Sequence, residues 1–392
     1  MNTKFVCTGF GEVYYKETET TRCIKCNEPV ELEELNNGTI DYGKTDYSLS
    51  RYRSFYPWLN LDKEFTLGEG FTPLVPVEMP YGRIYIKNES INPTWSFKDR
   101  GTITGVLWAS KINMKAIGTV STGNMAASVA AYGAKAGMET VIFVKEEMPA
   151  EKLSPITVYG ARVIKVKGDY GELYKKSIEL GRREGIYFIN SDSPFRVEGY
   201  KTIAFEIFEQ LGNKVPDFVI VPVSAGGNIR GIEKGFRELK ASGYTDKMPK
   251  FVAVQARGCN PIERGFLKGE MEIERVTKPD TIAHAIENPF PPSGNQTLRL
   301  IKRTGGTVIS VDDSEILNSQ GMLARRGLFV QTASAASETA AEKLINRGII
   351  KPEDIVVCIA TASGLKFTEA LKYQKSRVES INLEELQDLT LD

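Results

Sequence analysis

The feature that most constrains the fold is a regular alternation of short apolar runs with longer segments of helical periodicity. Strands are expected at 83–87, 116–120, 141–144, 163–166, 217–223, 251–255, 307–311 and 355–360. Helices are expected at 98–112, 124–136, 150–159, 171–184, 196–211, 228–240, 314–325, 333–347 and 364–374. Such alternation predicts mostly parallel sheets with helices on both faces. Two successive sets predict two doubly wound α/β domains with the active site between them.

Length, charge and cysteine content set the class of protein. A chain of 392 residues exceeds one ordinary core, so two domains and a small additional module are expected. Fifty basic and fifty acidic residues cancel, which leaves no net field to attract nucleic acid or an anionic membrane. No apolar run approaches the ~20 residues of a membrane span. The first residues contain no signal-peptide core, and five cysteines do not make a disulfide framework, so we expect a cytoplasmic protein.

A lysine at the expected start of a helix is the most informative residue for chemistry. In the segment 92–101, Pro93 excludes a helical conformation from the residue before it, and Thr94 or Ser96 can cap a helix that begins near Lys98. Because the first turn of a helix is positive, a lysine there is better placed as a neutral amine. A neutral amine can condense with a carbonyl cofactor, whereas the alternative is a lysine that extends into solvent.

The segment 92–101, Asn-Pro-Thr-Trp-Ser-Phe-Lys-Asp-Arg-Gly, resembles the cofactor-lysine motif of the threonine synthase family. Those proteins are pyridoxal-phosphate enzymes of the tryptophan-synthase-β fold type, and they usually carry a small residue in place of Trp95. The resemblance implies that Lys98 binds pyridoxal 5'-phosphate as a Schiff base and then transfers protons at Cα and Cβ of the substrate. Residues 67–74, Leu-Gly-Glu-Gly-Phe-Thr-Pro-Leu, resemble another family segment, so this loop is expected to meet the lysine loop rather than form a simple surface turn.

A second motif, Ser121-Thr122-Gly123-Asn124, lies between a strand and a helix. Backbone N–H groups at such a helix start suit a carboxylate or a phosphate, and the alternative is a simple helix cap by Asn124 or Thr122. The motif resembles the family loop in which the asparagine contacts the cofactor ring hydroxyl. By that resemblance Ser121, Thr122 and Gly123 hold the substrate carboxylate. Met125 departs from the family, where a threonine helps to hold the substrate phosphate.

A third motif, Ser224-Ala225-Gly226-Gly227-Asn228, also ends a strand and opens a helix. Adjacent glycines allow close backbone approach to an anion, and the helix dipole adds attraction. Neither the dinucleotide-binding glycine spacing nor a Walker lysine is present, so a small phosphate cup is expected. The resemblance assigns this cup to the cofactor phosphate, although Ser224 and Ala225 differ from the usual residues.

The stretch 190–202 resembles the family segment that faces the substrate phosphate. By resemblance Ser191 and Arg196 contact that group, and arginine suits it as a bidentate donor. The alternative is an exposed ion pair between Arg196 and Glu198 at the start of a helix.

A threonine at the end of the last strand, Thr361, corresponds to the family residue at the pyridine nitrogen. A neutral hydroxyl leaves that nitrogen largely unprotonated, and the alternative is a cap for the following helix. Ala362 and Ser363 replace the usual glycine and histidine, and Gln331 stands where glutamate is common.

The first 45 residues resemble the zinc ribbon that threonine synthases often carry, in a broken copy. Cys7, Cys23 and Cys26 are present, but Phe10 occupies the fourth ligand position. Structural zinc sites are normally closed by four protein ligands, so no metal is expected. A carboxylate or a water as the fourth ligand is the alternative.

Three further features bear on the site. His284 is the only histidine, which excludes multi-histidine metal sites and, unless His284 itself serves, Ser-His-Asp catalysis. It is expected to be a packed or rim residue. Asp312 and Asp313 are expected to cap a helix. The Pro/Gly-rich loop 289–296 is expected to edge the cleft.

The resemblance runs from about residue 67 to residue 366 and implies a domain organisation. The expected units are a module of residues 1–45, a large cofactor-binding domain of residues 46–102 and 201–375, a small substrate domain of residues 103–200, and a tail of residues 376–392.

The activity implied by the resemblance is that of a lyase: γ-elimination of phosphate from O-phosphohomoserine and addition of water at Cβ, which gives threonine. The same motifs would serve an enzyme that eliminates or replaces a β-substituent, such as a threonine or serine dehydratase or an enzyme acting on O-phosphoserine or O-acetylserine. A non-catalytic sensor of cofactor or amino acid is a further alternative, because several pocket positions depart from the family. The expected partner is a small amino-acid substrate, and the expected assembly is a homodimer.

Overall fold

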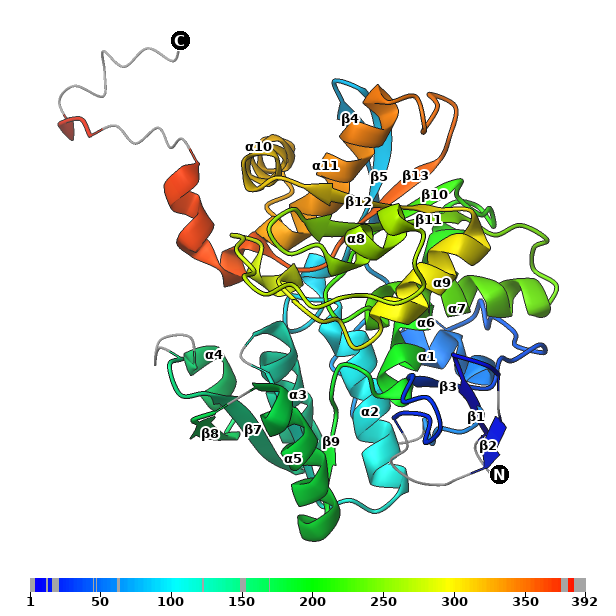
Figure 1. Ribbon diagram of the computed structural model, residues 1–392, viewed down its shortest axis with the longest axis vertical. Helices are drawn as coiled ribbons and strands as arrows, with labels where there is room; N and C mark the ends of the chain where they lie inside the picture. The colour runs from blue at the N-terminus through cyan, green and yellow to red at the C-terminus, as the bar shows by residue number, and fades with distance from the viewer. Residues whose placement is uncertain are drawn as a thin grey trace.

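The structure is a computed structural model with three sheets (Figure 1). It describes residues 4–11, 13–15, 21–44, 46, 48–61, 64–121, 123–148, 153–168, 170–374 and 380–383. A three-stranded sheet belongs to the N-terminal module, and a six-stranded and a four-stranded sheet form the two larger units. The domain boundaries given above stay a prediction.

The six-stranded sheet has the strand order β12-β11-β10-β13-β5-β4. Its strands are β4 (Leu74–Met79), β5 (Gly82–Asn88), β10 (Phe218–Pro222), β11 (Lys250–Ala256), β12 (Thr307–Val311) and β13 (Val356–Ala360). All neighbours run parallel except β4, which pairs antiparallel with β5 at the edge. Both β10 and β13 are buried along their whole length, as expected of parallel strands covered on both faces.

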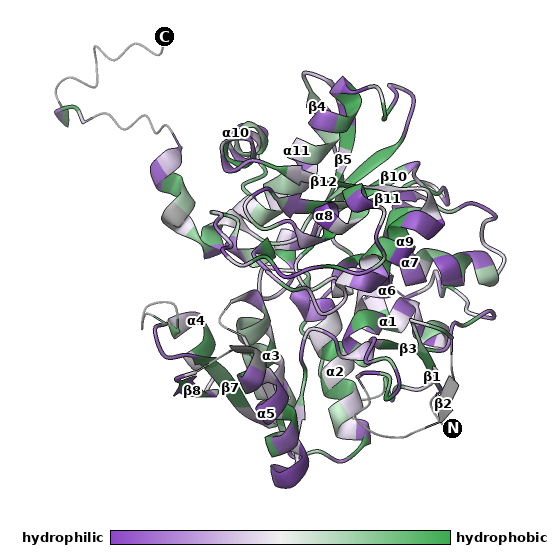
Figure 2. Cartoon of the chain, viewed as in Figure 1, coloured by the Kyte–Doolittle hydropathy of each residue, from purple (hydrophilic) through white to green (hydrophobic). Residues whose placement is uncertain are grey.

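Helices cover both faces of this sheet because successive side chains of a strand point in opposite directions. In β10, Val219 belongs to the apolar cluster shared with α7 (Gly227–Ala241) and α9 (Gly294–Thr304). Its neighbour Ile220 belongs to the cluster shared with α11 (Thr332–Asn346). Figure 2 shows the resulting pattern, with hydrophobic residues along β5 and β13 and hydrophilic residues on α7. The remaining helices of this unit are α8 (Pro261–Lys268) and α10 (Asp313–Ala324).

The four-stranded sheet has the order β8-β7-β6-β9 and is entirely parallel. Its elements are β6 (Ala116–Val120), α3 (Asn124–Ala136), β7 (Glu139–Lys145), α4 (Ser154–Thr157), β8 (Arg162–Val166), α5 (Tyr170–Glu184) and β9 (Ile186–Phe188). Two helices, α2 (Lys98–Lys111) and α6 (Pro194–Gln210), pack against each other. Because α2 also contacts α3 and α6 also contacts α7, this helix pair joins the two units.

The N-terminal module is a small antiparallel sheet of β1 (Lys4–Cys7), β2 (Val13–Tyr15) and β3 (Val30–Leu32), in the order β2-β1-β3. It is followed by α1 (Ser48–Arg51) and a 3₁₀ turn, η1 (Arg53–Phe55). Phe5 of β1 packs edge-on against Phe195 of α6, with ring centroids 5.7 Å apart. The module therefore shares the core of the larger unit.

The predicted fold class is confirmed: the two larger units are α/β, and their sheets are mostly parallel. Most expected strands and helices lie within a few residues of their predicted bounds. One expected helix is wrong: residues 364–374 form short 3₁₀ turns, η5 (Gly364–Lys366) and η6 (Thr368–Tyr373). The loop expected at 289–296 ends earlier than predicted, because α9 begins at Gly294.

The helix expected at 150–159 is only partly described. The described residues contain α4, and residues 150–152 lie outside them. Several elements were not expected, namely the three strands of the module, β4, β9, α1, α8 and α9. In the part of the chain that the structure describes, no helix combines the length and the apolar character needed to cross a membrane.

Candidate active site

A pocket lies where parallel strands of both larger sheets end. Lys98 follows β5, Asn124 follows β6, and Ser191 follows β9. From the six-stranded sheet, Ser224 follows β10 and Thr361 follows β13. Because parallel strands end at the same edge of a sheet, the loops after them converge there. The residues that line the pocket are Phe97, Lys98, Asn124, Ser191, Arg196, Tyr200, 222–229, Ala285, Ile286, Ala333 and Thr361.

Lys98 is the first residue of α2 and faces this pocket, so it does not simply extend into bulk solvent. Its Nζ lies 4.3 Å from the centre of the Phe97 ring. Burial, and then the positive charge of Arg196, hold the pKa of Lys98 well below its ordinary value. The neutral amine is therefore favoured, and a neutral amine acts as a nucleophile and as a base.

The prediction that Thr94 or Ser96 caps α2 is wrong. The N-cap residue is Phe97, and no side chain caps the helix there. Instead Asp99, inside the first turn, accepts hydrogen bonds from the backbone N–H of Thr94 at 2.7 Å and from its hydroxyl at 2.6 Å. A carboxylate is favourable at the positive end of a helix. This contact ties the loop before Lys98 to the helix that begins with it.

The expected meeting of the two loops is confirmed. The backbone N–H of Gly70 donates to Asn92 Oδ1 at 3.1 Å. Beneath them the buried guanidinium of Arg100 donates to Glu89 at 2.6 Å and to Glu206 at 2.6 Å. Buried ion pairs need such complete hydrogen bonding to offset the cost of desolvation. This network therefore holds the loop before Lys98 in one position.

The glycine loop 224–228 forms a cradle beside Lys98. Gly226 is the N-cap of α7 with φ +91°, and a Cβ there would lie 2.8 Å from Ser293 Cβ. Only glycine fits that conformation and that space. Both polar atoms of the buried Asn228 side chain lack a hydrogen-bond partner among the described residues. The loop thus presents backbone N–H groups and an unsatisfied amide to the pocket.

Thr361 lines the same pocket. Its hydroxyl shares a hydrogen bond of 2.8 Å with the hydroxyl of Ser334, which is buried in α11. The alternative of a helix cap by Thr361 is wrong, because Ser363 accepts the bond from Leu365 N at 3.2 Å and caps η5. Thr361 is therefore available as a neutral polar group in the pocket.

Asn124 also points its side chain at the site rather than at its own helix. The N-cap of α3 is Gly123, without a side-chain cap, so the alternative of a cap by Asn124 is wrong. Asn124 Nδ2 donates to Gln331 Oε1 at 3.0 Å, and Asn124 Oδ1 is buried without a described partner. Ser121 and Gly123 lie beside Asn124 but do not line the pocket, and Thr122 lies outside the described residues.

Arg196 is fully buried in the first turns of α6 and lines the pocket. Its Nε donates to the hydroxyl of Tyr200 at 2.7 Å, while both terminal nitrogens lack a partner among the described residues. The alternative of an exposed pair with Glu198 is wrong, since Glu198 is buried and pairs with Lys201 at 2.5 Å. An unpaired buried cation is costly, so this guanidinium is suited to an anionic ligand.

Ser191 lies near Arg196 on the pocket wall, and its hydroxyl is 3.7 Å from the sulfur of Met125. Met125 is buried behind that wall. Trp95 is 52% exposed and does not line the pocket, so its side chain does not narrow the site. Its φ of +62° explains why a small residue is more usual there.

Several lining residues were missed by sequence reasoning. Phe97 and Tyr200 belong to motifs that were recognised, but aromatic residues next to a lysine or an arginine carry no signal of their own. Ala285, Ile286 and Ala333 are small or apolar, and only the folding of distant segments brings them to the pocket.

The other sequence expectations concern the rim. His284 is exposed beside these lining residues, and its Nδ1 lies 3.0 Å from Glu287 Oε2, so it is at the rim rather than packed. Asp312 is the N-cap of α10 as predicted, and Glu315 accepts from its backbone N–H at 2.8 Å. The loop 289–296 borders the cradle, because Ser293 N donates to Ala225 O at 3.0 Å.

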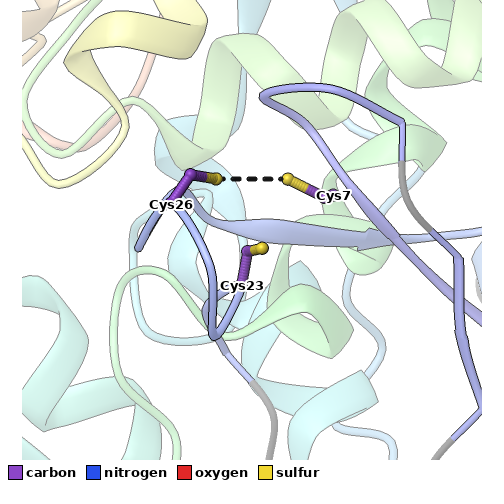
Figure 3. Close-up of side chains that lie close together, drawn as sticks. All are labelled: Cys7, Cys23 and Cys26. Atoms are coloured by element: carbon purple, nitrogen blue, oxygen red, sulfur yellow. Dashed lines mark hydrogen bonds between the residues drawn. The ribbon is translucent and has the colours of Figure 1, made fainter.

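The three cysteines of the N-terminal module lie close together (Figure 3), and none of them lines the pocket. Their sulfur atoms lie within 4.8 Å of one another, and the sulfurs of Cys7 and Cys26 are 3.4 Å apart. Among the described residues, no histidine, further cysteine or carboxylate joins Cys7, Cys23 and Cys26 as a fourth ligand. The nearby Glu28 carboxylate is held by Asn295 and other side chains of α9. The donor set does not fit a closed four-ligand zinc site.

The pocket does fit pyridoxal phosphate. It combines an amine of lowered pKa at Lys98, a glycine cradle for a phosphate, and unsatisfied amide atoms at Asn124 and Asn228. Unsatisfied buried polar atoms in a native fold indicate a missing partner. The donors are those that an aldehyde, a phosphate and a ring hydroxyl require.

Comparison with known proteins gives the family. Residues 65–362 match the family model described as pyridoxal-phosphate dependent enzyme. A threonine synthase of Methanocaldococcus jannaschii is 39% identical over 377 residues, covering 89% of this chain and 93% of that protein. A threonine synthase of Methanosarcina acetivorans is 37% identical over 369 residues, covering 92% of this chain and 91% of that protein.

A solved structure shares the fold. The processed form of threonine deaminase isoform 2 from Solanum lycopersicum superposes with a TM-score of 0.66 at 21% identity, covering 86% of this chain and 96% of that one. Together with the matched model and the two relatives, the pocket leads to one conclusion. This chain belongs to the pyridoxal-phosphate-dependent enzymes and, within them, to the threonine synthase family.

Proposed function

We propose that this chain is a threonine synthase, which converts O-phosphohomoserine and water into threonine and phosphate. The observation that carries the proposal is the buried guanidinium of Arg196, whose terminal nitrogens have no described partner although it lines the same pocket as Lys98. A neutral amine beside an uncompensated cation suits an amino acid that must lose a proton and that carries a strongly anionic group.

The residues divide the work in this proposal. Pyridoxal phosphate, when bound, supplies an electron sink that stabilises negative charge at the substrate Cα. The cradle Ser224, Ala225, Gly226, Gly227 and Asn228 holds the cofactor phosphate through backbone N–H groups and the Asn228 amide. Asn124 faces the ring hydroxyl. The Thr361 hydroxyl, fixed by Ser334, leaves the ring nitrogen uncharged.

Lys98 moves the protons. Its lowered pKa allows the released amine to take a proton from Cα and then from Cβ. Phosphate leaves from Cγ, which gains a proton. Water then adds its hydroxyl at Cβ, and its remaining proton goes to the released phosphate. Lys98 returns a proton to Cα, so the products are threonine and hydrogen phosphate.

Two other groups of residues hold the substrate in this proposal. Ser191 and Arg196 bind the leaving phosphate, and Arg196 offers two parallel donors. Ser121, Thr122 and Gly123 are proposed to bind the α-carboxylate at the start of α3, by the resemblance of their loop. The charge of the same Arg196 adds to burial in lowering the pKa of Lys98. The residue proposed to bind phosphate therefore also affects the protonation of the base.

The test is release of inorganic phosphate from O-phosphohomoserine by the purified holoenzyme. We expect threonine and phosphate in equal amounts, and loss of most turnover when Arg196 is replaced by Gln. Arg237→Gln is the control, because Arg237 is an arginine of α7 that pairs with Glu31, Glu34 and Glu233 and does not line the pocket. Phosphate release that survives Arg196→Gln unchanged, or no phosphate release at all, contradicts the proposal.

A second candidate is an enzyme that eliminates or replaces a β-substituent of another amino acid. Met125 and Ala225 favour it, because by the resemblance both positions have lost a polar side chain. The threonine usual at position 125 helps to hold the substrate phosphate, and Ala225 lies in the neighbouring cofactor cradle. O-Phosphoserine, O-acetylserine, serine and threonine belong in the same assay. Release of a keto acid or acetate faster than release of phosphate from O-phosphohomoserine would select this candidate.

We further propose that the enzyme is a cytoplasmic homodimer. Five free cysteines, two of them with sulfurs 3.4 Å apart, support a reducing compartment. Sedimentation analysis of the holoenzyme tests the assembly, and a monomer at micromolar concentration would contradict it.

A further inference from the structure

The N-terminal knuckle, residues 21–29, contacts two segments that adjoin the pocket, through Asp192 and Pro292. It closes on itself through a bridge between Arg22 and Pro29 and through a hydrogen bond of 2.8 Å from Cys23 N to Glu28 O. The guanidinium of Arg22 also donates to Asn27 O at 2.7 Å, so this side chain is braced by its own loop.

The same guanidinium reaches two other segments. Arg22 Nε donates to Asp192 Oδ2 at 3.1 Å, and a terminal nitrogen donates to Pro292 O at 3.0 Å. The Asp192 side chain is fully buried, while Arg22 remains 27% exposed. Burial raises the pKa of Asp192, and the charges of Arg22 and Arg230 oppose that effect. The second oxygen of Asp192 accepts from the hydroxyl of Tyr174 on α5.

Asp192 connects Arg22 to the wall that holds Ser191 and Arg196. It directly follows Ser191, which lines the pocket, and directly precedes Ser193, the N-cap residue of α6. Arg196 lies in the first turn of that helix and donates through Nε to Tyr200. A shift of Asp192 therefore moves both residues proposed to bind the substrate phosphate.

Pro292 connects Arg22 to the cradle. The next residue, Ser293, donates through its backbone N–H to Ala225 O at 3.0 Å, and its Cβ leaves room only for glycine at Gly226. Arg22 thus joins two segments that adjoin the pocket, one beside Ser191 and one beside the cradle.

A second side chain of the knuckle strengthens this attachment. Glu28 accepts from Asn295 at 2.9 Å and from Arg299 at 2.6 Å, both on α9. The knuckle is therefore held by α9 through Glu28, and Arg22 is the side chain that reaches both Asp192 and Pro292.

We propose that Arg22 is a positioning residue for the phosphate-binding wall of the active site. It acts through Asp192 and Pro292 and touches neither substrate nor cofactor. The inference rests on the proposed function, since it concerns the phosphate of that substrate. A positioning role predicts that loss of Arg22 weakens phosphate binding while Lys98 keeps its cofactor and its proton transfer.

The test compares Arg22→Ala and Arg22→Lys with Lys4→Ala in the holoenzyme. Lys4 is the matched control because it is a cation of the same module whose partner, Glu33, is exposed. The measurements are kcat and KM for O-phosphohomoserine, the cofactor content by absorbance, and the Kd of inorganic phosphate by equilibrium dialysis. The holoenzyme is used so that the cradle already holds the cofactor phosphate.

We expect Arg22→Ala to raise both KM and the phosphate Kd by roughly tenfold or more, the loss of one charged hydrogen-bonded contact, with kcat changed less than about threefold. Arg22→Lys keeps the charge but cannot reach all three acceptors, so its KM and phosphate Kd should lie between those of the wild type and of Arg22→Ala. Lys4→Ala should match the wild type. An unchanged phosphate Kd in Arg22→Ala overturns the proposal, as does a parallel loss of cofactor content.

A double-mutant cycle with Asp192→Asn tests the route. If Arg22 acts through Asp192, the second substitution has a smaller effect on the phosphate Kd in the presence of the first. Fully additive effects contradict that route. Because phosphate binding is measured without turnover, a wild-type enzyme that binds phosphate but does not convert O-phosphohomoserine would refute the proposed function and leave this test intact.

Discussion

At the scale of single residues, the pocket is organised by one unbalanced charge. Arg196 lines the pocket with terminal nitrogens that have no partner among the described residues, and its charge adds to burial in lowering the pKa of Lys98. Both effects have the same origin, which is a cation buried beside an amine. The arrangement favours an anionic substrate group that would satisfy the guanidinium.

Two positions near that cation weaken the phosphate site. Met125 touches Ser191 through its sulfur, and Ala225 lines the pocket without a polar side chain. Two missing hydrogen bonds to a charged group cost roughly 3–6 kcal/mol if nothing compensates. We therefore predict weak turnover of O-phosphohomoserine by the wild type, and a rise of at least about tenfold in kcat/KM for Met125→Thr combined with Ala225→Asn.

Phosphate release under steady-state conditions checks this prediction, with Met125→Leu as the apolar control that should bring no gain. A wild-type kcat/KM already typical of efficient enzymes would contradict it and would mean that Ser191, Arg196 and the backbone suffice.

At the scale of elements, the loop 66–70 is joined to α3 by a buried carboxyl. The hydroxyl of Tyr132 donates to Glu69 at 2.7 Å, and Thr66 and Leu67 N donate to the same carboxyl at 3.1 Å. Burial raises the pKa of Glu69 to about 7, from an ordinary value of 4.5. The carboxyl therefore holds its proton more tightly in the folded than in the unfolded chain.

This gives a pH dependence with a definite sign. Since the folded pKa is the higher one, the free energy of unfolding falls as pH rises from about 4.5 to about 7, and the gap between the two values corresponds to about 3 kcal/mol. Glu69→Gln should lack this component. Urea unfolding at pH 5, 6, 7 and 8 measures it, with the exposed Glu139→Gln as the control. Wild-type and Glu69→Gln curves that stay parallel would exclude the effect.

The N-terminal module gives an element-scale prediction about metal. Three sulfurs converge, but the described residues offer no fourth ligand, and Phe10 is 54% exposed at the position where one would be expected. We predict substoichiometric zinc and little effect of chelators on unfolding, because folding depends on metal only where a complete site exists. Elemental analysis that finds one tightly held zinc per chain, lost in Cys23→Ser, would show the prediction to be wrong.

Local sequence signals predicted strands better than helix ends. Runs such as β10 and β13 consist of apolar residues that are stable only when buried, so the sequence signals them clearly. The start of α2 is instead set by Asp99, which accepts a hydrogen bond from Thr94 in the preceding loop. The segment 364–374 has helical spacing but forms 3₁₀ turns, with Ser363 capping the first one. Tertiary contacts determine the structure of both segments, and the spacing of residue types along the chain gives no signal of those contacts.

At the scale of the whole molecule, the alternation of strands and helices predicted the class and the place of the site. Lys98, Asn124 and Thr361 were expected together because their motifs resemble those of one family, and the convergence of loops after parallel strands explains why they meet. Ala285, Ala333 and the Arg22 contact were not, because nothing in an alanine or in an arginine of a remote module signals its distant partner.

The central claim is that Lys98 carries the cofactor. Borohydride reduction of the holoenzyme, followed by peptide mass spectrometry, tests it. We predict one covalent adduct per chain, on Lys98, and none in Lys98→Ala. Lys366 is the demanding control, because burial lowers its pKa to about 8 and its Nζ donates to Thr94 O at 2.6 Å, close to the same loop. The adduct should persist in Lys366→Ala. An adduct that remains in Lys98→Ala, or that maps to Lys366 in the wild type, would contradict the account.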